Sequence, residues 1–127
     1  MINFEIDYQD FVAHIRPSGP LSKTDFEDLA RAIDPVIADV GELHGLLIET
    51  EDFPGWESLG AFVHHLAFIR DHHKQIQRIA LVTDATLGVI AEKIASHFIV
   101  AEIKQFHAGA ADRARAWIAS GDEDELT

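Results

Sequence analysis

Residues 46–56 read LLIETEDFPGW, an apolar run that passes into an acidic and aromatic segment. The apolar part at 46–48 suits a short strand that is buried on both faces of a sheet. The part at 49–56 carries several carboxylates together with Pro54 and Gly55, so it predicts a loop. Apolar residues then recur at helical spacing, at Leu59, Phe62, Val63, Leu66 and Ile69. The segment therefore predicts a strand, a loop and a helix in that order.

The same order recurs towards the C-terminus. Residues 79–82, IALV, predict a second buried strand, and the apolar positions between Leu87 and Phe98 predict another helix. A last strand is expected at 101–106 and a last helix at 110–120. Alternation of strands and helices without hairpin spacing implies right-handed crossovers and a mainly parallel sheet.

The N-terminal part predicts an antiparallel pair and a first helix. Apolar residues alternate at 2–6, and a second strand at 11–15 follows a turn. Ser22 or Thr24 can cap a helix whose core stripe is Phe26, Leu29, Ala30, Ile33, Ile37 and Val40, with a kink or break after Asp34 because of Pro35. We expect one α/β domain over residues 1–120, with a mixed, mainly parallel sheet of four to five strands and about four crossover helices. Residues 121–127 are expected to form an acidic flexible C-terminal tail.

The composition excludes several classes of protein. With 22 acidic and 10 basic residues the net charge is -12, so the chain should repel nucleic acid and anionic headgroups. The absence of cysteine fits a reducing compartment and predicts a cytoplasmic protein. No run approaches the roughly 20 apolar residues that span a bilayer, so no integral membrane association is expected.

Several of these segments together resemble the SpoIIAA-like group of STAS-type proteins. The resemblance rests on the strand at 46–48, the acidic and aromatic loop at 51–57, the strand at 78–82 and the closing Ala116-Trp117-Ile118. It covers nearly the whole chain. It implies a four- or five-stranded sheet crossed by helices, in a family whose members bind protein partners or hydrophobic ligands, and it implies no cofactor.

The aromatic residues of the loop are the first candidate site. Phe53 and Trp56 flank Pro54-Gly55 at the carboxyl end of a buried strand, where open α/β sheets bind ligands. They are predicted to form a movable cover over an apolar pocket between the carboxyl ends of the sheet and the second helix, with Phe62 and Leu66 as further ligand-binding residues. The alternative is an aromatic plug on the end of the sheet. No catalytic constellation and no glycine-rich phosphate loop accompany them, so we expect a non-catalytic binding module for a small apolar ligand or lipid.

Ser58 supports an alternative function. Anti-sigma-factor antagonists of the STAS superfamily carry a phosphorylatable serine in an Asp-Ser-Ser/Thr-Gly motif before the second helix. The similar place here reads Trp56-Glu57-Ser58-Leu59-Gly60, which lacks the second hydroxyl residue and has glutamate in place of aspartate. On this reading the chain is a regulatory domain that binds a protein partner and is switched near Ser58.

One face of the second helix predicts self-association. At about 100° per residue, the face opposite the core stripe carries Ala61, His64, His65, Phe68 and His72. Ala61, His65, Phe68 and His72 are the predicted interface of a pH-sensitive homodimer. The alternative is that a neighbouring element partly covers this side of the helix. No metal site is predicted, because the histidines of this helix offer no pair at i, i+4.

Overall fold

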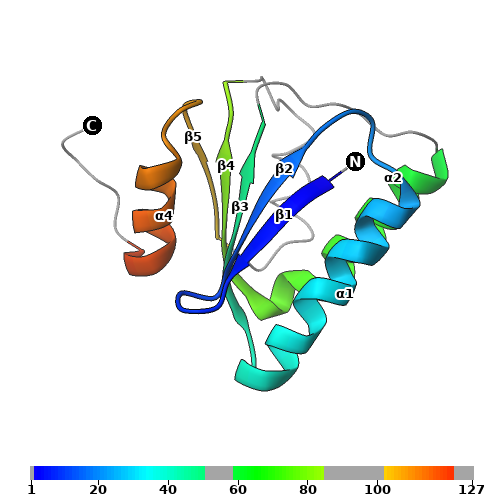
Figure 1. Cartoon of the computed structure of the whole chain (residues 1–127), viewed down its shortest axis with the longest axis horizontal. Helices are drawn as coiled ribbons and strands as arrows, with labels where there is room; N and C mark the ends of the chain where they lie inside the picture. The colour runs from blue at the N-terminus through cyan, green and yellow to red at the C-terminus, as the bar shows by residue number, and fades with distance from the viewer. Residues whose placement is uncertain (1, 51–58, 85–101, 122–127) are drawn as a thin grey trace.

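The computed structural model describes residues 2–50, 59–84 and 102–121. The helix predicted between Leu87 and Phe98 and the tail at 122–127 lie outside these residues. The described elements are β1 (Ile2–Asp7), β2 (Val12–Pro17), α1 (Lys23–Val40), β3 (Leu43–Glu49), α2 (Leu59–His72), the 3-10 turn η1 (His73–Gln75), β4 (Ile76–Val82), β5 (Glu102–Phe106) and α4 (Ala111–Ser120) (Figure 1).

The strands form one five-stranded sheet in the order β1-β2-β3-β4-β5. β1 and β2 are antiparallel, and the pairs from β2 to β5 are parallel. This topology confirms the predicted α/β class with a mixed, mainly parallel sheet. β3 starts earlier than expected and extends through Glu49, which the sequence had placed in the following loop.

Helices cover both faces of the sheet. α1 and α2 lie side by side on one face, whereas α4 lies on the opposite face (Figure 1). Successive residues of β3 supply the two layers: Leu46 packs with the core under α1, and Leu47 packs with the core under α4. The apolar run at 46–48 is therefore part of the middle strand of a sheet with two buried faces.

α1 has a well-defined beginning and end. The Ser22 side chain accepts a hydrogen bond from the Asp25 backbone, and the Asp25 carboxylate accepts one from the Ser22 backbone, which completes a capping box. The helix ends at Gly41, whose φ of 90° is in the left-handed region. It is one continuous element through Pro35, so the break considered after Asp34 is absent. Val40, predicted in the core stripe, is 44% exposed because it lies in the last turn, next to the glycine end.

α4 is fixed to the sheet by an apolar and a polar contact. Ile118 is 1% exposed and packs against Gly45 of β3. Its backbone carbonyl accepts a hydrogen bond of 2.8 Å from Nη1 of Arg78 on β4. Trp117 completes this layer against Phe106, with ring centroids 5.8 Å apart. The last helix is therefore part of the domain core.

Candidate functional site

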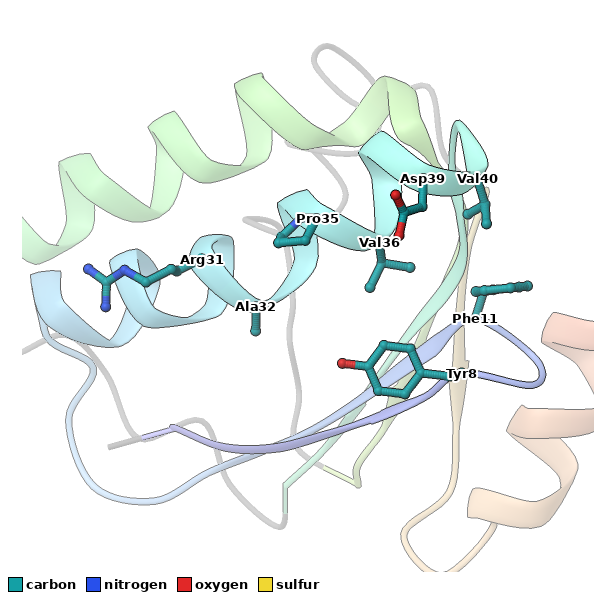
Figure 2. Close-up of a pocket in the computed structure, with 8 residues that line it drawn as sticks. All are labelled: Tyr8, Phe11, Arg31, Ala32, Pro35, Val36, Asp39 and Val40. Carbon is teal, nitrogen blue, oxygen red and sulfur yellow. The ribbon is translucent and has the colours of Figure 1, made fainter.

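A pocket of about 320 Å³ lies between the β1–β2 turn and the second half of α1. Tyr8 and Phe11 come from the turn, and the other lining residues come from α1: Arg31, Ala32, Pro35, Val36, Asp39 and Val40. Figure 2 shows Ala32, Val36 and Val40 pointing from α1 towards the two aromatic rings. The lining is largely apolar, with Arg31 and Asp39 as its charged members.

The turn that forms one wall is built by local hydrogen bonds. Oδ1 of Asp7 accepts from the backbone N–H groups of Gln9 at 2.8 Å and Asp10 at 3.1 Å. These backbone hydrogen bonds, with a further contribution from Arg115, lower the pKa of Asp7. Arg115 of α4 donates to the other carboxylate oxygen at 2.9 Å. Asp7 therefore fixes the turn and joins it to the far side of the sheet.

Phe11 has a strained backbone at the edge of the pocket. Its φ of 56° is in the left-handed region, which residues with a side chain rarely adopt. Its carbonyl accepts a hydrogen bond of 2.9 Å from the backbone N–H of His44, and its ring meets the His44 ring edge-on at 5.7 Å. Such strain costs about 1–3 kcal/mol and is typical of sites where function fixes the backbone.

Sequence reasoning did not find this pocket. Its two walls are at least 20 residues apart along the chain, and the turn residues 8–10 were interpreted only as a connection between strands. Two signals were present. Tyr8 is a large aromatic residue in a polar turn and is 68% exposed, and Pro35 lies with Ala32 on the helix side away from the core stripe.

The carboxyl ends of the strands, where the sequence placed the ligand, carry a polar network. Nε2 of His14 lies 2.8 Å from Oε1 of Glu49, and Nε of Arg16 lies 3.5 Å from the same oxygen. The buried His14 and the more exposed Arg16 both come from β2, so this carboxylate joins β2 to β3. The geometry assigns Glu49 to an ion-pair network within the sheet.

Asp84 organises the neighbouring end of β4. Its Oδ1 accepts a hydrogen bond of 3.1 Å from the backbone of Ala108 and lies 3.2 Å from Nδ1 of His107. These two hydrogen bonds, the backbone one first, lower the pKa of Asp84. The contact holds the turn after β5 next to the end of β4, in a position exposed to solvent.

Several residues of the predicted sites lie outside the described residues. Phe53, Trp56 and Ser58 belong to the span 51–58. Ala61, Phe62 and Leu66 lie within α2, but their side chains are not among those described. The predicted cover, pocket and phosphorylation site therefore stay predictions.

The predicted outward face of α2 needs a correction. Phe68 and His72 are 9% and 7% exposed, and both pack towards α1. Phe68 stacks on the His72 ring at 4.3 Å, and His65 stacks on Phe26 of α1 at 4.7 Å. The prediction that Phe68 and His72 face away from the core is wrong, and the alternative of a helix side covered by a neighbouring element holds for these two residues, because α2 packs against α1. Burial lowers the pKa of His65 to about 4.

Two further properties concern the described part of the chain. In residues 2–50, 59–84 and 102–121, no group of three or more histidine or carboxylate side chains is placed to hold a metal ion. The helices of the same ranges all fall short of the length and apolar character needed to cross a membrane.

Comparisons with known proteins agree with this architecture. A family model described as SpoIIAA-like matches residues 12–119. Among solved structures, the chain is similar to an uncharacterized protein of the DUF3478 family with a SpoIIAA-like fold, from Shewanella loihica PV-4. The two are 25% identical, the alignment covers 93% of this chain and 92% of that chain, and the TM-score is 0.65. A search of curated proteins finds no match.

Proposed function

The chain belongs to the SpoIIAA-like family, and on that premise we propose that it binds a small apolar ligand or lipid in the pocket between the β1–β2 turn and α1. At the level of the family, the fold supports a non-enzymatic binding module. The observation that carries the proposal is the pocket itself, with apolar side chains converging from two separate elements. The family match begins at residue 12. Tyr8 and Phe11, which form the wall of the pocket that comes from the turn, lie before the matched residues.

The size and chemistry of the pocket support a small apolar ligand. Ligand sites usually occupy about 300–1,000 Å³ and are lined mainly by apolar groups, and this pocket is at the lower end of that range. Tyr8 and Val40 are 68% and 44% exposed, so a ligand would remove their apolar surface from water. Arg31 is already paired with Asp28 at 3.0 Å, which leaves apolar area as the main source of affinity.

The test is a titration of a fluorescent fatty acid into wild type and Tyr8→Ala, with Gln9→Ala as the matched control in the same turn. Losing most of one aromatic contact should weaken binding by about 1–3 kcal/mol, whereas Gln9→Ala should bind like wild type. Circular dichroism checks the fold of each variant. Absence of saturable binding to wild type would contradict the proposed function.

Trp56→Ala separates this pocket from the location predicted at the carboxyl ends of the strands. If Tyr8→Ala weakens binding and Trp56→Ala does not, the ligand occupies the pocket beside α1. The reverse result would place the ligand under the predicted cover formed by Phe53 and Trp56, with Phe62 and Leu66, and would keep the proposed ligand class while moving the site.

The second candidate function is a regulatory domain that binds a protein partner and is switched by phosphorylation near Ser58. It is supported by the place of Ser58 before the second helix, which is similar to the place of the phosphorylatable serine in anti-sigma-factor antagonists. A native mass spectrum of freshly purified protein distinguishes the two candidates. A co-purified lipid or fatty acid supports the binding module, whereas a phosphate adduct that is lost in Ser58→Ala supports the switch.

A further inference from the structure

His72 has an acceptor at each ring nitrogen. It is the last residue of α2 and is 7% exposed. Its Nδ1 lies 2.8 Å from the backbone oxygen of Phe68, one turn earlier in the same helix. Its Nε2 lies 2.6 Å from Oδ1 of Asp34 on α1. The ring therefore joins the end of α2 to the middle of α1.

The chemistry of these acceptors favours a ring that carries two protons. A carbonyl oxygen and an ionised carboxylate can only accept hydrogen bonds, whereas a neutral imidazole has one N–H to donate. Both contacts are satisfied when the ring carries both N–H groups and is an imidazolium. The Asp34 side chain is 61% exposed, so its charged form stays hydrated while it pairs with the buried ring.

We propose that His72 is a proton-dependent lock between α1 and α2, closed when its ring is doubly protonated and opened when it loses one proton. On deprotonation the ring has a single N–H left, so it loses either its hydrogen bond to the Phe68 carbonyl or its charge-assisted bond to Asp34. The contact between the helices then weakens. The Phe68 ring, which stacks on His72 and lies 6.3 Å from Phe26, is the apolar surface that opening would uncover.

Other ionisable groups on this interface are placed differently. Nε2 of His64 lies 3.9 Å from Oε1 of Glu27, and both side chains are well exposed. His65 stacks on Phe26 and is disfavoured as a cation by burial. Asp71 and Lys74 flank the end of α2 and are exposed. Among the described residues, Asp34 is the charged group that pairs with the His72 ring.

The protonation state can be measured directly on the full chain. Nitrogen chemical shifts of the His72 ring distinguish imidazolium from neutral imidazole. The pH at which the ring changes from imidazolium to neutral imidazole should match the pH at which the contact between the helices weakens. Asp34→Asn, which keeps the shape and the acceptor oxygen, should lower that pH, because the imidazolium loses its carboxylate partner. Asp39→Asn, on the same helix, is the control for the loss of one negative charge.

Hydrogen exchange tests whether the proton closes the contact. Between about pH 6 and about pH 8.5, protection of the α2 amides, corrected for intrinsic rates, should fall by about fivefold or more relative to β3 and β4. Asp34→Asn should remove most of this pH dependence, and Asp39→Asn should retain it. A His72 ring that stays neutral throughout the range in which α2 protection changes, or α2 protection independent of pH, would overturn the proposal. Both outcomes are measured on the wild-type protein, so the test does not depend on whether a variant folds.

Discussion

Ile118 of α4 packs so closely over Gly45 of β3 that a Cβ atom at position 45 would lie 2.5 Å from Cγ2 of Ile118. Ile118 is 1% exposed, and close packing in a protein interior leaves such a side chain little room to move. Glycine is therefore required at residue 45 because α4 lies so close to β3. The φ angle of residue 45 is not the reason.

Gly45→Ala should destabilise the domain by about 1–3 kcal/mol, because an added methyl group overpacks this contact. Urea unfolding followed by circular dichroism measures the change. Combining Gly45→Ala with Ile118→Ala should cost less than the sum of the two single changes, since alanine lacks the Cγ1, Cγ2 and Cδ1 atoms that a Cβ at residue 45 would meet. Additive costs would show that the contact does not limit residue 45.

Ser22→Ala should lower the free energy of unfolding by about 1 kcal/mol, the usual cost of losing an N-cap hydroxyl. Thr24→Ala is the matched control, because Thr24 is exposed and lies inside the first turn of α1, beyond the cap. It should change the stability by less than about 0.5 kcal/mol. Equal effects of the two substitutions would contradict the assignment of Ser22 as the cap.

Stability should fall in mild acid because of His65. Its pKa is about 4 in the folded protein and 6.5 in the reference state, so the unfolded chain takes up a proton first as the pH falls. The folded state loses stability from about pH 6.5 down to about pH 4, by roughly 2–3 kcal/mol for a side chain that is mostly buried. His65→Gln, which does not titrate, should flatten this part of the profile.

The control for His65 is His107→Gln, at a side chain that is 90% exposed. Between about pH 6.5 and about pH 4, thermal unfolding should give the same slope for this variant as for wild type, because the contact of His107 with Asp84 lowers the pKa of that carboxyl and acts in stronger acid. If His65→Gln also kept the acid-sensitive slope of wild type, the buried ring would not be its source. The contribution of His65 has the opposite sign to that proposed for His72, which is lost in alkaline solution.

Filling the pocket should block ligand binding without unfolding the protein. Ala32 points from α1 towards Tyr8 (Figure 2), so Ala32→Leu places three additional carbon atoms in the space a ligand would use. Affinity for a fluorescent fatty acid should fall by about tenfold or more, with the melting temperature unchanged or slightly higher. Ala119→Leu, at an exposed position of α4, is the control for added apolar surface. Unchanged affinity in Ala32→Leu would move the ligand elsewhere.

Local patterns predicted the elements because each pattern reports a property of its own segment. The run at 46–48 is apolar at every position, which only a strand covered on both faces needs. Ser22, one of the two predicted caps, marks the beginning of α1 through the hydrogen bonds of a helix terminus. The alternation of strands and helices then restricted the topology to a mainly parallel sheet, as found.

Only the tertiary structure decided which surfaces the helices share and where the pocket lies. Periodicity predicts that a helix side is buried, but not whether its neighbour is the sheet or another helix, so Phe68 and His72 were placed on the wrong side of α2. The contact between His72 and Asp34 joins residues 38 positions apart. The pocket likewise exists because the turn at Tyr8 and Phe11 is held at one distance from α1. Such distances arise from packing of the whole core, which no single segment encodes.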